Sequence, residues 1–215
     1  MHPAASAQCE TEQSEALNRD GSSIRLVQKQ CHESNRCLLQ VDVRPDRASP
    51  YAMVLRRIKP MNQAPAVGGH LIDIDSDGLF EVEEVDYCGA GPNCFRRIYK
   101  VDAKSRKSHL FFEGGYFLFR KIGDFYVTSG RSGCCSWEHQ IYAKPENQLT
   151  IDDQHHRYTI TVGADSGTPT KTQCLVSKRI GYDWLLASPP NALLNLCAFY
   201  GNHYRLNPPG TQAGP

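Results

Sequence analysis

Residues 73–84 read Asp73-Ile-Asp-Ser-Asp-Gly-Leu-Phe-Glu-Val-Glu-Glu84, with aspartate at positions 1, 3 and 5, glycine at position 6 and glutamate at positions 9, 11 and 12. This spacing matches the calcium-loop pattern D-x-D-x-D-G-x5-E. A hard divalent cation takes about six to eight oxygen ligands, and alternate side chains of a tight loop can turn toward one centre. We therefore predict a Ca2+ site whose ligands are carboxylates and one backbone carbonyl, supplied by Asp73, Asp75, Asp77, Leu79 and either Glu81 or Glu84.

The segments on either side of this loop have the pattern of strands. Residues 70–72 are mostly apolar, and residues 80–85 alternate between apolar and acidic for most of their length. The site is therefore predicted to be strand–loop–strand, unlike the helix–loop–helix EF-hand, and Glu81 is preferred over Glu84 as the closing ligand. The alternative is a solvated acidic turn without a metal, because D-x-D-G is also common turn chemistry.

The composition predicts a mainly β protein. Short runs of aromatic and β-branched residues are punctuated by 17 glycines and 13 prolines in 215 residues. We expect an antiparallel β-sandwich or β-propeller-like sheet protein with one short C-terminal helix, which begins after Ser188-Pro189-Pro190 and ends before Gly201. The net charge of +1 gives no charge excess that would favour nucleic acid or a membrane surface.

The predicted organisation is a flexible tail over residues 1–22, a single β-rich domain over 23–207 and a disordered tail over 208–215. A hairpin is expected around Gly114-Gly115. The basic residues of the strand 95–101 are expected either to pair with the acidic strand 81–86 across a sheet or to face water. Other predicted strands are 23–27, 37–43, 51–58, 125–128, 137–142, 157–162 and 174–177.

Nine cysteines without a CxxC motif favour disulfides in an exported, periplasmic protein over a metal or thiol-catalytic site. The segment Ala5-Ser6-Ala7 has the form found before a signal-peptidase cut, which agrees with export. The odd number leaves at least one thiol free. The closely spaced pairs are predicted to bond, and the remaining candidates lie later in the chain: Cys31 with Cys37, Cys88 with Cys94, then Cys134, Cys135, Cys174 and Cys197.

The adjacent cysteines Cys134 and Cys135 are expected to bond to other strands, for instance to Cys174, Cys197 or the N-terminal cysteines, because a ring closed by neighbouring residues is strained. No hydrolase elbow G-x-S-x-G, zinc motif H-E-x-x-H or glycine-rich phosphate loop occurs. His155 and His156 would point to opposite faces of a strand and chelate poorly. His139 near Cys134 suggests a thiol nucleophile only if that cysteine is reduced. We therefore expect that the protein is not an enzyme.

The order of motifs resembles a known family. The resemblance runs through residues 70–81, a Gly/Asn/Cys turn, residues 95–101, Ser129 to Gly133 and Trp137 to Tyr142, and it covers roughly residues 65–165. This order is similar to that of periplasmic calcium-binding immunity proteins of xanthomonads. Those proteins neutralise lysozyme-like toxins delivered by a type IV secretion system. They are similar in fold to bacterial inhibitors of invertebrate-type lysozyme.

The resemblance implies a β-sandwich-like inhibitor with a structural Ca2+ and a protruding loop that enters the cleft of a peptidoglycan hydrolase. Glycosidase clefts carry paired carboxylates, which a serine and an arginine can bind. Disulfides through Cys134 or Cys135 would pre-organise this loop. The alternative is that the loop is only a flexible hairpin. The matching partner-binding residues are Ser129, Gly130, Arg131 and Ser132.

The predicted function is that of an exported immunity or inhibitor protein that neutralises a secreted, envelope-targeting toxin. One alternative is immunity to a protease or lipase toxin, since fold alone does not fix the partner. The other is a calcium-dependent carbohydrate-binding module of the envelope, with Tyr116, Trp137 and His139 as the aromatic platform.

Overall fold

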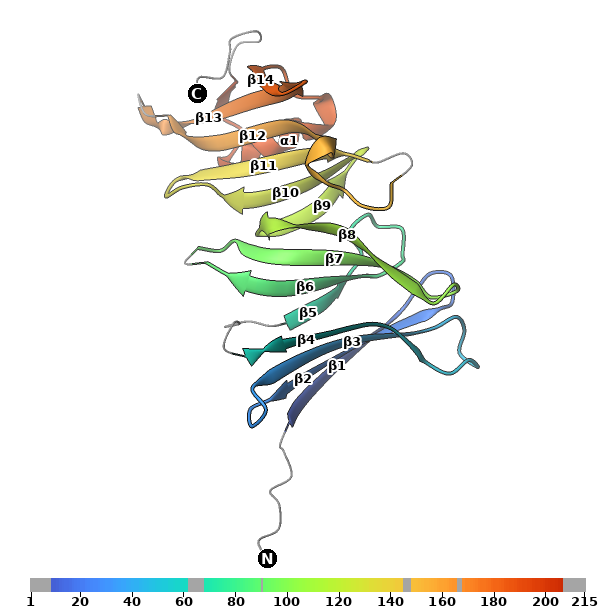
Figure 1. Cartoon of the computed structure of the whole chain (residues 1–215). Helices are drawn as coiled ribbons and strands as arrows, with labels where there is room; N and C mark the ends of the chain where they lie inside the picture. Colours follow the sequence, from blue (N-terminus) through green and yellow to red (C-terminus); the bar gives the residue numbers. More distant parts are fainter. Residues whose placement is uncertain (1–8, 62–67, 90, 145–147, 166–167, 207–215) are drawn as a thin grey trace, which may run out of the picture. The chain divides into compact units, whose positions relative to one another are not determined.

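The computed structural model describes residues 9–61, 68–89, 91–144, 148–165 and 168–206, and strands dominate it (Figure 1). Strands make up most of the described residues and pair almost entirely antiparallel, which confirms the predicted fold class. The chain packs as two compact units, where a single domain over 23–207 was predicted. The first unit comprises Met1–Ala90 and Cys94–Gly114, and the second comprises Gly91–Asn93 and Gly115–Pro215.

The first sheet of unit 1 is an up-and-down meander. Its strands, in spatial and chain order, are β1 (Cys9–Leu17), β2 (Ser23–Cys31), β3 (Arg36–Arg44) and β4 (Ala52–Pro60). Strand β1 lies in the segment that was predicted to be a flexible tail, so that prediction is wrong for residues 9–17. It was missed because nearly all of its side chains are polar and exposed, which leaves no apolar alternation to detect. The predicted tail residues 1–8 and 208–215 lie outside the described residues.

The second sheet of unit 1 carries the acidic loop. Its strands are β5 (Gly68–Ile72), β6 (Glu81–Cys88), β7 (Cys94–Asp102) and β8 (Lys107–Tyr116), again in chain order. In β2 and β3 of the first sheet, the buried apolar residues recur at every second position, so they point to one face of the sheet. The two sheets share one buried core, as in a sandwich, formed by Ile24, Leu26, Leu39, Val41, Val43, Val82, Tyr99 and Ala103.

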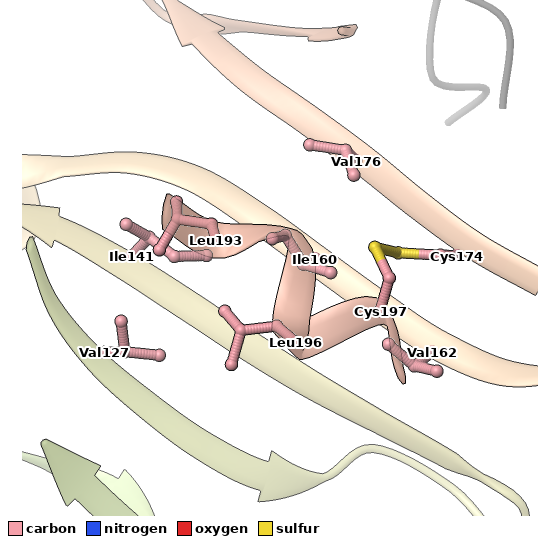
Figure 2. Close-up of a cluster of buried hydrophobic side chains, with 9 residues drawn as sticks. All are labelled: Val127, Ile141, Ile160, Val162, Cys174, Val176, Leu193, Leu196 and Cys197. Atoms are coloured by element: carbon pink, nitrogen blue, oxygen red, sulfur yellow. A yellow bond between two sulfur atoms is a disulfide. The ribbon is translucent and has the colours of Figure 1, made fainter. Parts of the chain in front are cut away.

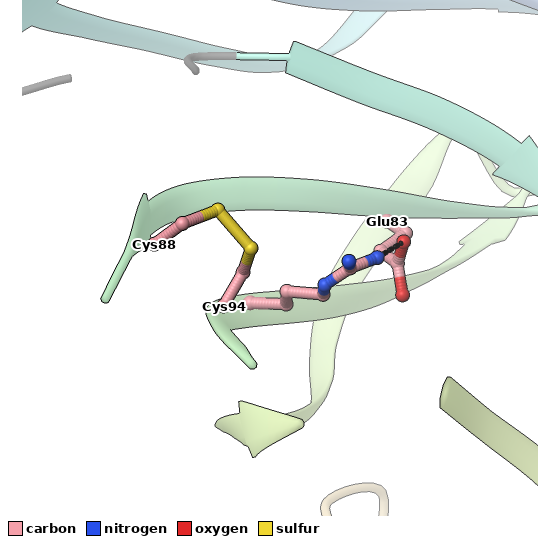
Figure 3. Close-up of a disulfide and its surroundings, with 4 residues drawn as sticks. Glu83, Cys88 and Cys94 are labelled. Carbon is pink, nitrogen blue, oxygen red and sulfur yellow. Dashed lines mark hydrogen bonds and ion pairs between the residues drawn. A yellow bond between two sulfur atoms is a disulfide. The ribbon is translucent and has the colours of Figure 1, made fainter. Parts of the chain in front are cut away.

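The basic strand β7 pairs with the acidic strand β6, as one of the two sequence-based alternatives predicted. Their side chains form three ion pairs, which are half-buried or buried: Arg96–Glu83 at 2.6 Å, Arg97–Asp86 at 2.7 Å and Lys100–Glu81 at 3.2 Å. A disulfide between Cys88 and Cys94 joins the ends of the two strands, with Glu83 nearby on β6 (Figure 3).

Unit 2 is one large sheet covered by a short helical segment. The sheet follows the order β14 (Asp183–Leu186), β13 (Thr168–Ile180), β12 (His156–Asp165), β11 (Ser136–Ala143), β10 (Phe125–Arg131) and β9 (Leu118–Ile122), with β15 (Tyr204–Leu206) parallel to β13. The helical segment consists of η3 (Asn191–Leu193), α1 (Leu194–Cys197) and η4 (Ala198–Tyr200), so the predicted C-terminal helix is confirmed. Figure 2 shows the core beneath it: Val127, Ile141, Ile160, Val162, Cys174, Val176, Leu193, Leu196 and Cys197.

The hairpin predicted around Gly114-Gly115 is wrong. Both glycines lie inside β8, and the next strand, β9, pairs with β10 in a different sheet. The pair of glycines therefore does not turn the chain, and the two flanking segments are not hydrogen-bonded to each other as a hairpin would be.

The cysteine pairing differs from the prediction at two places. The structure contains the disulfides Cys9–Cys31, Cys88–Cys94 and Cys174–Cys197. The predicted Cys31–Cys37 bridge is wrong, because Cys31 lies opposite Arg36 on β3, and this offset of one residue turns its side chain to the face opposite that of Cys37. Cys9 lies directly opposite Cys31 and bonds to it instead, while Cys37 is a buried free thiol.

The adjacent cysteines Cys134 and Cys135 do not reach other strands, contrary to the prediction. Both are free and exposed, at the tip between β10 and β11. Their expected partners Cys174 and Cys197 are bonded to each other within the core of unit 2. The loop that carries Ser132 is therefore not cross-linked by a disulfide.

Candidate functional site

The loop between β5 and β6 gathers three carboxylates. One oxygen each from Asp73, Asp75 and Glu81 lies within 4.8 Å of the other two. Two residues of the loop take left-handed backbone conformations, Ser76 at φ 57° and Gly78 at φ 80°. A Cβ atom on Gly78 would lie 2.7 Å from the Cβ of Arg19, so this position excludes side chains both by conformation and by space.

The loop is held by its own backbone amides and by the turn after β1. The carboxylate of Asp73 accepts hydrogen bonds from the amides of Asp77 at 3.2 Å and Gly78 at 3.0 Å. The side-chain oxygen of Asn18 accepts one from Phe80 N at 3.0 Å, and Arg19 N donates to Gly78 O at 2.8 Å. These contacts fix the shape of the loop through interactions within the protein itself.

Asp77, one of the predicted ligands, is not among the three clustered carboxylates. The exposed side chain of Asp77 accepts a hydrogen bond from the amide of Leu79 at 2.7 Å. Leu79 is itself exposed, and its predicted ligand is the backbone carbonyl. The structure therefore brings Asp73, Asp75 and Glu81 together and leaves Asp77 in a turn at the rim of the loop.

The geometry separates the two alternatives for the closing ligand. Glu81 lies in the cluster, where it also accepts a hydrogen bond from Ile74 N at 3.1 Å. Glu84 lies three residues further along the strand and therefore points to the opposite face. There it is completely buried, with Lys59 Nζ at 2.6 Å and the Tyr99 hydroxyl donating to it at 3.0 Å. Glu84 is thus a structural ion-pair partner, apart from the loop.

The charges of the cluster fit a hard divalent cation. Burial raises the pKa of Glu81 to about 7, and Lys100, whose Nζ lies 3.2 Å from the carboxylates of both Asp75 and Glu81, opposes this rise. One ammonium faces three carboxylates, so negative charge remains in surplus when all three are ionised. The donor atoms are all oxygens, the type that Ca2+ and Mg2+ prefer over the nitrogen and sulfur ligands of softer metals. A metal ion would supply positive charge that ties the loop to β6.

The second candidate region is the hairpin of β10 and β11, where Ser129 faces His139 directly across the strands. Ser129 Oγ and His139 Nδ1 lie 2.7 Å apart, and the two residues are 4% and 1% exposed. Burial, with the nearby charge of Arg120, lowers the pKa of His139 to about 4. Ser129 was predicted to bind a partner, but its burial removes it from any surface contact in this conformation.

The remaining predicted partner-binding residues lie toward the exposed tip of the same hairpin. Arg131 is exposed, and its backbone is bracketed by Asn93, which donates to Arg131 O and accepts from Arg131 N, each at 2.8 Å. The guanidinium donates to Gly133 O at 2.9 Å and also to Cys134 O. Ser132 Oγ lies 3.0 Å from Ser136 Oγ. The tip is therefore an ordered turn, held by hydrogen bonds.

An aromatic surface, defined by Phe117, Trp137, Phe199 and Tyr200, adjoins this tip. Neighbouring ring centroids are 5.6, 4.7 and 4.9 Å apart in that order. Phe117, Phe199 and Tyr200 are 48%, 45% and 48% exposed. Trp137 lies opposite Arg131 in the β10–β11 register, so the two side chains leave the sheet on the same face.

Sequence reasoning found only one member of the aromatic surface. Trp137 was predicted as part of an aromatic platform, but its predicted companions Tyr116 and His139 are buried. Phe117, Phe199 and Tyr200 were missed because the four rings come from separate segments that meet only in the folded sheet. Side chains of a strand alternate between its two faces, and Tyr116 is buried where its neighbour Phe117 is exposed. This alternation is the signal that could have placed Phe117, instead of Tyr116, in the predicted platform.

Comparisons with known proteins are sparse. No family model matches the chain, and no curated protein matches it. The chain is similar to a solved structure described as that of a Xanthomonas type IV secretion system related protein, with 14% sequence identity and a TM-score of 0.46. The match covers 85% of this chain and 100% of the other.

The disulfides and the helices give information on where in or outside the cell the protein resides. Three disulfides fit an exported protein, since thiols stay reduced in the cytosol of most organisms. Among the described residues, no helix has both the length and the apolar character needed to cross a membrane.

Proposed function

We propose that the protein is an exported inhibitor of the immunity type, which neutralises a secreted, envelope-targeting toxin by binding it. The aromatic surface beside Arg131 carries this proposal. Trp, Tyr and Arg are the residues most enriched where binding energy concentrates in protein interfaces, and exposed apolar patches mark binding sites. The proposed target class is a peptidoglycan hydrolase, whose cleft presents paired carboxylates.

The hairpin tip has the properties of a pre-organised contact. Asn93 fixes the backbone of Arg131 on both its amide and its carbonyl side. Two carbonyls of the tip orient the guanidinium through Nε and Nη2, while Nη1 has no hydrogen-bond partner among the described residues. A side chain that is ordered before binding loses less conformational entropy on binding, so the contact with a carboxylate is stronger.

The proposal treats the protein as a binder without catalytic activity. The pair Ser129–His139 has the distance of a nucleophile and its base, but both members are buried, and the ring of Phe199 lies near that of His139. A nucleophile must meet its substrate, so this pair serves packing and hydrogen bonding in the proposed role. The acidic loop of unit 1 is assigned to Ca2+ as a structural clamp.

Binding to a purified hydrolase tests the proposal. We would assay peptidoglycan hydrolases, proteases and lipases encoded beside this gene, which also separates the lysozyme-type target from the alternative toxins. Stoichiometric inhibition of a hydrolase is the expected result. Arg131→Ala and Phe199→Ser should each weaken the affinity by roughly 30-fold, the effect of losing about 2 kcal/mol at an interface hot spot.

The matched control is Tyr182→Ser, which removes a 95% exposed aromatic ring from the turn between β13 and β14 of the same unit. This variant should inhibit as well as the wild type. If no toxin-class enzyme binds, the proposed function is wrong. Equal losses in Phe199→Ser and Tyr182→Ser would exclude the aromatic surface as the contact.

A carbohydrate-binding module is the second candidate, because aromatic rings also stack on sugars. The ring geometry favours a protein partner: successive planes in the aromatic surface meet at 76°, 36° and 86°, so the rings do not form a flat platform. Sedimentation with insoluble peptidoglycan separates the two. Co-sedimentation that Phe199→Ser abolishes would favour the carbohydrate module over the inhibitor.

A further inference from the structure

We propose that Cys134 and Cys135 form a redox-active vicinal dithiol, which small-molecule disulfides oxidise to a vicinal disulfide, and that ring closure releases Arg131 from the tip of the hairpin. The two Sγ atoms lie 2.8 Å apart, and both residues are exposed. The oxidation step is independent of the proposed function. Only its effect on partner binding rests on that function.

This pair differs from every other cysteine of the chain. Six cysteines are bonded in three disulfides, and Cys37 is buried. Cys134 and Cys135 are thus the two thiols that an external reagent can reach. Their contact has a chemical consequence, because the shared hydrogen bond raises the pKa of Cys135 and the charge of Arg131 opposes this rise. Reaction should accelerate as the pH increases, since the thiolate is the nucleophile.

The structure confines the reaction to the tip. Below the cysteines, Ser132 N donates to Ser136 O at 3.0 Å, and the two serine hydroxyls lie 3.0 Å apart. These contacts close the turn at its base. The change in backbone geometry that a ring of adjacent cysteines requires can therefore be absorbed by Gly133, Cys134 and Cys135 without opening the β10–β11 ladder.

The chemistry balances with a low-molecular-weight disulfide such as oxidised glutathione as the oxidant. One protein thiolate attacks a sulfur of glutathione disulfide, whose S–S bond breaks and releases one glutathione thiolate, which takes up a proton. The neighbouring protein thiolate then attacks the protein sulfur of the mixed disulfide and releases the second glutathione. The protein loses two electrons and two protons, and the oxidant leaves as two molecules of glutathione.

Oxidation acts on Arg131 through the backbone. The peptide bond between Cys134 and Cys135 becomes part of the ring, and the carbonyl of Cys134 is one of the two that accept hydrogen bonds from the guanidinium. A ring of this kind is strained, and strained, exposed disulfides are the labile ones that can act reversibly. The redox state of the pair would thereby set whether the guanidinium is held in its pre-organised orientation.

Intact-mass measurement tests the redox step on the full-length protein. After incubation with oxidised glutathione, the wild type should lose the mass of two hydrogens and carry no glutathione, and peptide mapping should place the bridge at Cys134 and Cys135. The single variants Cys134→Ser and Cys135→Ser should each retain one glutathione. A wild type that stays unmodified, keeps a glutathione adduct or forms a disulfide-linked dimer would overturn the proposal.

NMR of the Arg131 side chain tests the coupling to the tip. The Nε–H signal should differ between the reduced and oxidised protein, and the double variant Cys134→Ser/Cys135→Ser should be insensitive to glutathione disulfide. An unchanged signal in a protein that mass spectrometry shows to be oxidised would overturn the release of Arg131. Neither readout uses a toxin, so failure here is distinguishable from failure of the proposed function.

Discussion

Lys59 links the two sheets of unit 1 electrostatically, and Arg57 Nε, 3.6 Å from Glu84, adds a weaker contact from the same strand. Lys59 Nζ lies 2.6 Å from a carboxylate oxygen of Glu84 and also pairs with Asp86, so one residue of β4 contacts two residues of β6. Glu84 is fully buried, and Tyr99 donates a hydrogen bond to the same carboxylate. An ionised group in this position depends on its partners, because removing the nearest one leaves a buried charge with much weaker compensation.

Replacing Lys59 by methionine should therefore destabilise the protein by about 3 kcal/mol, the cost typical of breaking one side of a buried ion pair. Urea denaturation followed by circular dichroism measures this change. Adding Glu84→Gln to the variant should restore part of the loss, because the buried carboxylate is then neutral. The control is Lys121→Met at an exposed position of β9. A loss below about 1 kcal/mol would show that Glu84 is not held by Lys59.

His139 should make the stability of the protein depend on pH. Its folded-state pKa is lowered from 6.5 to about 4 by burial and by Arg120, while Ser129 and the ring of Phe199 are its other neighbours. A depressed pKa means that the unfolded chain binds the proton more tightly than the folded protein does. The contribution of His139 to the unfolding free energy is therefore complete above about pH 6.5 and falls as the pH drops toward 4.

The contribution at stake is about 3 kcal/mol, from a shift of about 2.5 pKa units at 1.36 kcal/mol per unit. We expect His139→Gln to flatten the fall in unfolding free energy between pH 6.5 and 4, compared with the wild type in the same buffers. His203→Gln, an exposed histidine outside the regular strands, is the control. Identical pH profiles for wild type and His139→Gln would contradict the assignment.

At this scale, the sequence predicted some side chains well and misplaced others. The preference for Glu81 over Glu84 agrees with the cluster, because strand alternation alone separates positions three residues apart. Alternation also places Ser129 and Arg131 on one face of β10. Which part of that face η4 covers depends on a tertiary contact, through Phe199, that no local pattern contains.

The helical segment of unit 2 shows what a disulfide adds to an element. It has only 10 residues, too few to be stable alone. Leu193, Leu196 and Cys197 are fully or almost fully buried against the sheet, and the Cys174–Cys197 bridge ties the segment to β13. Packing and the covalent link together hold a helix that propensity alone could not maintain.

The loss of stability on removing each disulfide should depend on the length of the loop that it closes and on the burial of its sulfurs. The Cys174–Cys197 bridge spans 23 residues and the Cys88–Cys94 bridge spans 6. Loop entropy then predicts losses of about 3 and about 2 kcal/mol, respectively, for the paired Cys→Ala variants. The first loss should be larger still, because both of its sulfurs are buried and their removal leaves a cavity. Equal stability in denaturant titrations would contradict the ranking.

The acidic loop should be stabilised by Ca2+. At a concentration 100 times the dissociation constant, binding adds about 2.7 kcal/mol to the unfolding free energy, which corresponds to roughly 5–10 °C in Tm for a chain of this size. The shift relative to chelator should disappear in Asp75→Asn and Glu81→Gln. It should persist in Asp46→Asn, whose carboxylate caps an exposed turn far along the chain from the loop. Identical melting curves with Ca2+ and with chelator would exclude a structural calcium site.

Element by element, alternation and caps were the informative signals. They predicted the central strands and the C-terminal helix, because a buried face requires apolar residues that recur with the period of the strand or helix. They failed at β1, whose side chains face water and whose place is set by pairing with β2 and by Cys9–Cys31. They failed also at Gly114-Gly115, since glycines inside a strand and glycines in a turn look alike locally.

For the whole molecule, the division into two units was not predictable from composition. Each unit has its own buried cluster, one between two sheets and one between a sheet and a helical segment. The chain passes from unit 1 to unit 2 between Gly114 and Gly115, inside strand β8, so no linker between strands marks this boundary. Long-range pairing, such as that of β13 with the distant β15, depends on the assembled sheet.

The pairing of Cys9 with Cys31, while Cys37 stays reduced, has a consequence for biogenesis. Closing the short 31–37 loop costs less chain entropy than closing the 22-residue span of the native bridge, so the non-native bond should form first when the chain meets an oxidant. Correct maturation then requires exchange before β3 buries Cys37. We expect the yield after export to depend on a disulfide isomerase, and Cys37→Ala to abolish that dependence. Equal yields of the wild type with and without isomerase would show that the chain avoids this trap.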